Sequence, residues 1–463
     1  MTKLHEECGV FGIYDMSGTL DCARLTYYAL YALQHRGQEA CGIAVCRKDG
    51  EFACHKDVGL VPEVFGSYDF SRIEGKSAVG HVRYSGSAEN RSYSQPLVSK
   101  YKKGTMAIAN GGGLINRDVL VADLEERGAI FHTDTDAEII SYLVAKARAQ
   151  KHSLEDALHD VMDMLEGAYS TVVMTPRKIV AVRDPHGFRP LAIGKIEGAY
   201  IVCSETVALN AIGAEFVRDV KPGEIVILDE NGITSIDDKV GTKRISPCIF
   251  EYIYFARPDS VIDSQSVYEA RKLAGKCLAR SAPVEADIVI GVPDSGLCAA
   301  IGYAEESKIP YGYGLIKNRY ITRTFIQPSQ KQREESVRIK LNALAECVSD
   351  KRVVMVDDSI VRGTTSKNII TLLKNAGAKE VHVRISSPPF VWPCFFGTDI
   401  PSRKHLAGVK YTQEEIRQNL GADSLGFLRF EDLPSIIPNT DGNFCAACFS
   451  GDYPVHVPPE RLE

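Results

Sequence analysis

The strongest constraint on the fold is a repeated pattern in the second half of the chain, where short apolar runs end in polar loops and helical stretches follow. The runs are "ADIVIGVPDSG", "RVVMVDDSIVRGTT" and "EVHVRISSPP", and helices are expected at roughly 297–307 and 364–376. Fully apolar strands that alternate with helices are typical of βαβ units, in which helices cover both faces of a parallel sheet. The pattern predicts a doubly wound parallel sheet from about residue 285.

One segment of this region, "VVMVDDSIVRGTT", has the features of a phosphate site. Its apolar strand ends at Asp357 and Asp358, and a small, hydroxyl-rich loop then leads into a helix. Backbone N–H groups at a helix N-terminus bind phosphate, and carboxylates at a strand end suit sugar hydroxyls or a metal ion. A bare Asp-Asp pair would more often be a solvated turn, but the full thirteen-residue pattern favours a ligand site.

The first half of the chain has a different texture. Residues 8 to about 235 contain short strands such as "CGVFGIY", "CGIAVC", "SAVGHVRY" and "STVVMT", with helical stretches near 21–35 and 134–150. This pattern predicts a sheet-rich sandwich with helices. The break near 236–248 is the candidate domain boundary, and a third, loop-rich region from about 395 to 463 is expected to pack on the second domain.

Composition limits the classes of function. A chain of 463 residues is too long for one hydrophobic core, and 44% apolar and 25% charged residues are normal for a soluble multidomain protein with no membrane span. A net charge of -6 argues against a nucleic-acid binder. Thirteen cysteines without an export signal indicate a reducing cytoplasm, where clustered cysteines bind metal or do chemistry more often than they form disulfides.

The N-terminus, "MTKLHEECGVFGI", places a polar leader before Cys8. A secretory signal would need an apolar run of about 7–15 residues, which this leader lacks. Removing residues 1–7 would instead leave a thiol and a free α-amino group on Cys8. The α-amino pKa of about 7.7–8.0 lies near working pH, so the thiol would have a base within reach. The alternative is a buried cysteine that simply begins a strand.

Several long segments carry a family resemblance. The Asp-Asp segment is similar to the phosphoribosyl pyrophosphate (PRPP) motif of type I phosphoribosyltransferases, and nearly the whole chain resembles the glutamine phosphoribosylpyrophosphate amidotransferases. The matching segments are "EECGVFGI", "LQHRGQEACGI", "GHVRYS", "RDPHGFRPLAIG", "CIFEYIYFARPDS" and "NFCAACFSGDYP". The resemblance implies a propeptide (1–7), an αββα Ntn-hydrolase glutaminase domain (8–240), a type I phosphoribosyltransferase domain (241–395) and a C-terminal segment (396–463) packed on it.

The resemblance also implies an activity. Cys8 would hydrolyse glutamine, and the ammonia would pass internally to PRPP, giving 5-phosphoribosylamine, pyrophosphate and glutamate in the committed step of purine biosynthesis. Purine nucleotides would inhibit a cytoplasmic homotetramer. Two alternatives remain open: an ammonia-dependent phosphoribosyltransferase with an impaired glutaminase, and a non-catalytic purine or PRPP sensor.

The family pattern assigns roles to individual residues. Arg83 would pair with the α-carboxylate of glutamine and Asp136 with its ammonium, and Arg36 and Gly37 would line the same pocket. Ser295, Asp357 and Asp358 would help to hold Mg²⁺. The PRPP-binding residues implied are Lys317, Arg319, Arg338, Asp357, Asp358, Ser359, Gly363, Thr364 and Thr365.

Four cysteines form a further group. Cys445 and Cys448 alone could be half of a zinc site, a redox pair or core residues. Together with Cys248 and Cys394 they match the ligands of the family branch that carries a 4Fe-4S cluster, which four thiolates in aromatic surroundings suit. Zinc in the same four sulfurs is the main rival.

The chain departs from the family pattern at the oxyanion hole, where the usual His-Asn-Gly-Asn becomes "AIANGGGLIN". A gapless match puts Gly111 at the position of the oxyanion Asn and Gly112 at that of the N–H donor, with Asn110 one place too early. Loss of one such donor typically lowers the rate by about 100–1000-fold. Asn110 would replace the donor only if the glycine run allows a local shift.

Overall fold

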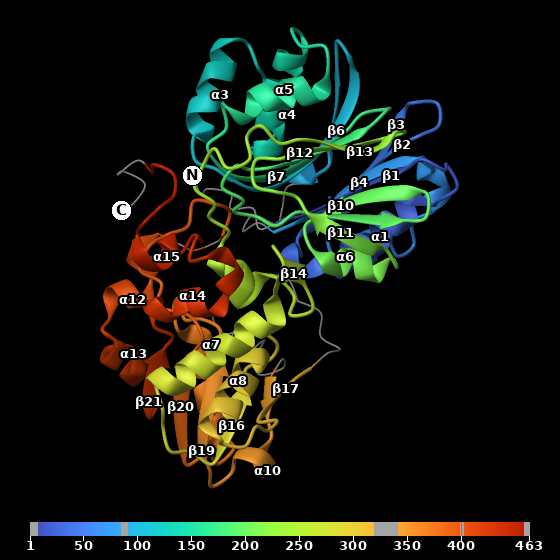
Figure 1. Cartoon of the computed structure of the whole chain (residues 1–463). Helices are drawn as coiled ribbons and strands as arrows, with labels where there is room; N and C mark the ends of the chain where they lie inside the picture. Colours follow the sequence, from blue (N-terminus) through green and yellow to red (C-terminus); the bar gives the residue numbers. More distant parts are fainter. Residues whose placement is uncertain (1–7, 85–90, 319–340, 399, 401, 458–463) are drawn as a thin grey trace.

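The computed structural model describes residues 8–84, 91–318, 341–398, 400 and 402–457 of the chain. Figure 1 shows two bodies: a helix-covered β-sandwich formed by the first half of the chain, and a sheet flanked by helices formed by the second half. In the described residues no helix is long and apolar enough to cross a membrane.

The sandwich consists of two antiparallel sheets. The first has the order β11-β9-β10-β1-β4-β2-β3, and the second β13-β12-β8-β7-β6-β5. The strands of the first sheet are β1 (Gly9–Asp15), β2 (Ala40–Cys46), β3 (Phe52–Val58), β4 (Ser77–Arg83), β9 (Ala192–Ile196), β10 (Ala199–Cys203) and β11 (Glu215–Asp219). Those of the second are β5 (Leu97–Tyr101), β6 (Gly104–Leu114), β7 (Gly167–Met174), β8 (Ile179–Arg183), β12 (Ile225–Asp229) and β13 (Gly232–Ile236).

Alternation along each strand produces three apolar layers. On β1, Val10 and Tyr14 pack between the sheets, whereas Phe11 and Ile13 face the helices that cover the first sheet. These helices are α1 (Cys22–Ala32), α2 (Val61–Phe65) and α6 (Thr206–Ala211), and α3 (Arg117–Glu126), α4 (Asp136–Arg148) and α5 (Leu154–Met162) cover the second sheet. The architecture is αββα, and the predicted helices near 21–35 and 134–150 correspond to α1 and α4.

The second half contains a four-stranded, all-parallel sheet of order β16-β19-β20-β21. Its strands are β16 (Ile288–Gly291), β19 (Arg352–Asp357), β20 (Glu380–Ile385) and β21 (Ser424–Phe427). Helices α7 (Val267–Ser281) and α8 (Leu297–Ser307) cover one face, and α11 (Thr364–Asn375) and α13 (Gln413–Leu420) cover the other. The predicted doubly wound sheet is confirmed, with α8 and α11 at the expected positions.

The C-terminal segment contributes more than packing. Its strand β21 pairs in parallel with β20, for example His382 with Ser424, and so completes the sheet. The sequence did not predict this strand because it is only four residues long and lies in a loop-rich region. Between the two bodies, the sandwich ends with β13 at Ile236, and the next helical element is the short π-helix η4 (Glu251–Phe255).

Candidate active sites

Cys8 lies buried between the two sheets, at the start of β1. Gly9 is opposite Val82 of β4, so the antiparallel register brings Cys8 opposite Arg83. From the second sheet, β6 approaches the same point: a Cβ added at Gly111 would lie 3.1 Å from the carbonyl oxygen of Cys8 and 3.6 Å from its Cβ. The Cys8 thiol is therefore surrounded by the adjoining ends of β1, β4 and β6.

Arg83 is a buried cation with unused hydrogen-bonding capacity. Its side chain is 5.1 Å from the centre of the Tyr93 ring, and among the described residues its Nε and Nη2 have no hydrogen-bond partner. Gly37 packs against its backbone so closely that any Cβ would lie 2.4 Å from the Arg83 nitrogen. A buried guanidinium with unpartnered N–H groups can accept a carboxylate in its fork.

Asp136 provides a negatively charged carboxylate at the same end of the sandwich as Arg83. It is the first residue of α4, and its Oδ2 accepts a hydrogen bond from the backbone N–H of Leu114, three residues after Gly111. Burial raises the pKa of Asp136 to about 6, although the charge of Arg117 opposes the shift. An ammonium group placed beside this carboxylate would favour the ionised form.

The structure does not bring the Asn110 side chain to Cys8. Alternation along β6 puts Ala109 between the sheets and Ile108 under the helices, so Asn110 belongs to the helix-covered face. There its Oδ1 accepts a hydrogen bond from the Thr171 hydroxyl at 2.7 Å, and its Nδ2 is buried without a partner among the described residues. The local shift that would let Asn110 serve as the oxyanion donor is absent, and the position next to Cys8 is Gly111.

Arg36 lies beside Gly9, the neighbour of Cys8, with its guanidinium in a buried ion network. Its guanidinium binds Glu205 of the sandwich and Glu251 of η4, with Nη2 at 2.7 Å from the Glu251 carboxylate. Arg189 donates to the same carboxylate at 2.8 Å. These side chains are all buried, so Arg36 stabilises the joint between the two bodies. Sequence reasoning missed Glu205, Glu251 and Arg189 because they lie far from Arg36 in the chain.

A second site lies at the carboxyl end of β19. Asp357 and Asp358 are buried there, and Oδ1 of Asp357 accepts a hydrogen bond from the N–H of Asp358 at 2.9 Å. Burial, followed by the charge of Asp358, raises the pKa of Asp357. The Ser359 hydroxyl donates to the Asp358 carboxylate. Two clustered carboxyls of this kind suit sugar hydroxyls or a cation.

Helix α11 begins directly beyond these carboxyls. Gly363, its N-cap residue with φ of 84°, has no side chain to cap the helix, which makes the first N–H groups, including those of Thr364 and Thr365, suited to a phosphate. Lys317, at the end of β17 (Leu315–Lys317), forms an ion pair with Asp294, the neighbour of Ser295 in the β16–α8 loop. Arg319 and Arg338 lie outside the described residues.

Comparisons with known proteins match both halves of the chain. A family profile described as a glutamine amidotransferase domain matches residues 81–211, and one described as a phosphoribosyl transferase domain matches residues 261–386. The amidophosphoribosyltransferase of Archaeoglobus fulgidus is 48% identical over 459 residues, which cover 98% of this chain and 100% of the relative. That of Bacillus subtilis is 48% identical over 464 residues, covering 98% and 95%. The chain belongs to the amidophosphoribosyltransferase family.

Solved structures agree with this family assignment. A structure titled as the allosteric regulatory enzyme of purine biosynthesis has a TM-score of 0.90 and 46% identity, and the match covers 98% of both chains. The B. subtilis glutamine PRPP amidotransferase complexed with ADP and GMP has a TM-score of 0.89 and 46% identity, covering 98% of this chain and 99% of that one. As a member of this family, the chain uses glutamine and PRPP to form 5-phosphoribosylamine, pyrophosphate and glutamate in purine biosynthesis.

The four cysteines singled out in this amidophosphoribosyltransferase converge beside the joint. Backbone hydrogen bonds join their segments: Ile249 donates to Cys445, and Trp392 donates to Cys448. Burial, and then the charges of Cys248, Cys394 and Cys445, raise the pKa of Cys448, so all four thiols are within electrostatic reach of one another. No group of three or more His, Cys, Asp or Glu side chains in the described part of the chain is placed to hold a metal ion.

Proposed function

We propose that removal of residues 1–7 makes Cys8 the N-terminal nucleophile of the glutaminase, with its own α-amino group as the base. The observation that carries the proposal is the buried Arg83 guanidinium, which lies opposite Cys8 and has two nitrogens without a partner among the described residues. A glutamine α-carboxylate would bind this fork, and its ammonium would pair with Asp136. Gly37 would line the pocket by allowing the close approach to Arg83.

The oxyanion that forms during attack by Cys8 would be stabilised by the backbone N–H group of Gly112, because that of Gly111 points into the β6–β7 ladder. A side-chain donor at position 111 is missing, and Asn110 faces the other side of β6. Because one such donor is worth about 100–1000-fold in rate, glutamine should be used less efficiently than ammonia. This observation favours the alternative of an impaired glutaminase beside an intact transferase.

In the transferase site, Asp357 and Asp358 would bind the ribose hydroxyls of PRPP, and the α11 N-terminus would bind its 5-phosphate together with Ser359. Lys317 would neutralise the pyrophosphate leaving group. The same role for Arg319 and Arg338, which lie outside the described residues, stays a prediction. Mg²⁺ would be held by the carboxyls and by Ser295 together with substrate oxygens, since Mg²⁺ in such sites keeps few protein ligands. Its charge would stabilise the departing pyrophosphate.

The four thiols of Cys248, Cys394, Cys445 and Cys448 would hold a 4Fe-4S cluster with a structural role. A single zinc ion requires all of its sulfurs within about 2.3 Å, whereas in a cubane each thiolate binds its own iron at a separate corner. Four neighbouring thiols in aromatic surroundings suit such a cubane, and zinc in the same four sulfurs is the rival. The proposal also includes inhibition by purine nucleotides, assembly as a homotetramer and a cytoplasmic location. The relative complexed with ADP and GMP supports nucleotide binding alone.

Anaerobic pyrophosphate release from PRPP, first with glutamine and then with ammonia, tests the proposal in the native chain and in Cys8→Ala. The proposal requires both nitrogen sources to work in the native chain and only glutamine use to disappear in Cys8→Ala. If only ammonia works in both proteins, the glutaminase is a relic. If neither works while PRPP still binds, the chain is a sensor.

A further inference from the structure

A pocket outside the two active sites lies at the opposite end of the sandwich. Its cavity of about 510 Å³ is of the size that holds small-molecule ligands. It is lined by the far end of β1 at Tyr14 and by the beginning of β6 at Thr105. Tyr14 lies six positions along the extended chain from Cys8, a distance of about 20 Å. A ligand in this pocket would therefore contact neither glutamine nor Cys8.

Tight hairpins fix the walls of this pocket. Three hairpin connections, β5–β6 of two residues, β7–β8 of four and β12–β13 of two, lie at the same end of the second sheet. They present Lys103, Arg177 and Asp229, respectively, to the cavity. The Thr175 N–H donates to the carbonyl oxygen of Lys178 at 2.9 Å, which closes the turn that carries Arg177. The charged groups are thus held on a rigid backbone before any ligand binds.

The pocket has an excess of unpaired positive charge. Lys76, Lys103, Arg148 and Arg177 line it, and none of them forms an ion pair with a carboxylate among the described residues. Arg148 donates from Nη1 to a backbone carbonyl, while its Nε is buried without a partner in the same part of the chain. The carboxylates on the lining are Asp229 and Glu230, so the unpaired cations outnumber them. Lys178 is neutralised by Glu155 at 2.7 Å.

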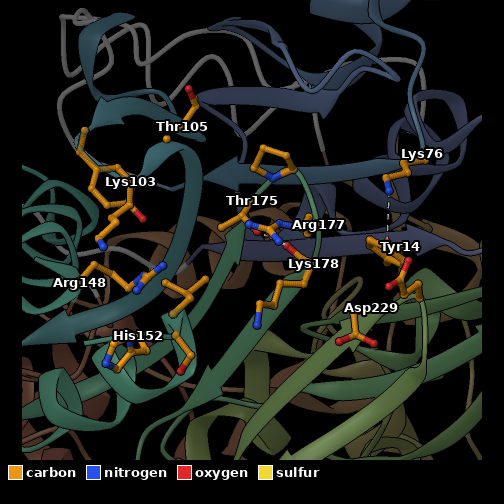
Figure 2. Close-up of a pocket in the computed structure, with 16 residues that line it drawn as sticks. Tyr14, Lys76, Lys103, Thr105, Arg148, His152, Thr175, Arg177, Lys178 and Asp229 are labelled. Atoms are coloured by element: carbon orange, nitrogen blue, oxygen red, sulfur yellow. Dashed lines mark hydrogen bonds between the residues drawn. The ribbon is translucent and has the colours of Figure 1, made fainter. Parts of the chain in front are cut away.

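The cations are spread along the cavity. Figure 2 shows Lys103 and Arg148 on one side, Lys76 beside Tyr14 on the other, and Arg177 between them. Lys76 donates to the Tyr14 hydroxyl at 3.4 Å and lies 5.5 Å from the ring centre. The N-terminus of α5 also reaches the lining at Leu154 and adds a partial positive charge. A row of cations fits a ligand with several linked anionic groups better than a single anion.

We propose that this pocket is a binding site for a small molecule that carries two or more linked phosphate groups. Lys103 and Arg148 would bind one end of the phosphate chain, and Arg177 and Lys76 the other. The shared chemistry is the phosphate chain, which could come from an inorganic polyphosphate or from a nucleoside polyphosphate. The site is separate from the PRPP site, which lies in the other body of the molecule (Figure 1).

Lysine footprinting of the native chain tests the site directly. Acetylation of single lysines is followed by mass spectrometry with and without inorganic tripolyphosphate, at constant ionic strength. Lys76 and Lys103 should be protected, whereas Lys102 and Lys48, which are exposed and do not line the pocket, should not. Equal protection of all four, or the same protection by sulfate, would reduce the pocket to an adventitious ion site only. A parallel titration with ATP distinguishes the two sources: stronger protection than by tripolyphosphate identifies a nucleotide, and equal protection an inorganic chain.

A matched pair of charge-reversed variants completes the test. Lys103→Glu with Arg177→Glu should weaken tripolyphosphate protection of Lys76 by roughly 100-fold in concentration, because two hydrogen bonds to charged groups are lost. Lys102→Glu with Lys48→Glu makes the same change in net charge outside the pocket and should leave that protection unchanged. All four side chains are exposed, so unchanged thermal melting is expected in both. Equal weakening by the two variants would overturn the proposal.

Discussion

At the scale of single residues, Gly111 should limit glutamine use. Its φ lies outside the left-handed region, and a Cβ there would meet Cys8 at 3.1 Å, which requires only a small adjustment. Gly111→Asn should therefore restore a side-chain oxyanion donor and raise glutamine-dependent kcat by about 100–1000-fold. The ammonia-dependent rate should not change. Steady-state pyrophosphate release with each nitrogen source measures both effects.

Asn110 gives the opposite test. Since its side chain binds Thr171 on the helix-covered face, Asn110→Ala should cost about 1–3 kcal/mol of stability and leave glutamine-dependent kcat within a few-fold. Thermal unfolding and glutaminase kinetics on the same preparation separate the two effects. A drop of glutaminase activity comparable to that of a lost oxyanion donor would mean that Asn110 reaches the reacting carbonyl after all.

The pKa of Asp136 predicts how glutamine use depends on pH. With the pKa raised to about 6 by burial, the free enzyme loses the carboxylate, and with it the partner of the substrate ammonium, as pH falls through that value. The kcat/KM for glutamine should fall about tenfold per unit below this pH, because kcat/KM reports ionisations of the free enzyme. The rate with ammonia, corrected for the free NH₃ concentration, should lack this break. Asp136→Asn should lower kcat/KM and abolish the break; a break that persists in the variant would assign it to another group.

At the scale of elements, the geometry of the α11 N-terminus depends on Gly363. A side chain at φ of 84° is strained by roughly 1–2 kcal/mol, and its Cβ would contact Leu420 at 3.3 Å. Gly363→Ala should raise the KM for PRPP by about 10–100-fold as N–H groups move away from the phosphate. Gly421→Ala is the matched control, because Gly421 ends α13 at φ of 73° with nothing within 4 Å of its Cβ. The Gly421→Ala variant should lose a similar amount of stability while its KM for PRPP stays unchanged. An equal change of this KM in the two variants would indicate general destabilisation.

Local elements could be predicted from the sequence because their signals are local. The run that ends at Asp357 and Asp358 contains its strand, loop and helix in sequence order, and β19 and α11 are found there. The neighbourhood of Cys8 depends instead on strand register, which places Arg83 and Gly111 beside it from two different sheets. The sequence match alone indicated the glycine at position 111, but the face on which Asn110 lies follows from the pleat of β6 and required the structure.

At the scale of the whole molecule, the joint between the two bodies is a buried ion network. Arg36 and Arg189 share the Glu251 carboxylate, and Arg36 also binds Glu205. Burial alone would raise the pKa of Glu205, but the charges of His35 and Arg36 hold it well below its ordinary value. A depressed carboxyl pKa stabilises the fold above the unfolded-state pKa, and this stabilisation is lost as pH falls through the folded-state value. The joint should thus be sensitive to acid.

Breaking the network at one residue should be costly. Glu251→Gln removes the charge that compensates two buried guanidinium groups and should lower the free energy of unfolding by about 3–5 kcal/mol. Glu224→Gln is the control within one body: Glu224 is equally buried, but its partner Arg218 is 37% exposed and can be rehydrated, so the loss should be smaller. Calorimetry under anaerobic conditions measures both. An equal loss in the two variants would mean that the ion network at the joint stabilises the fold no more than an ion pair within one body.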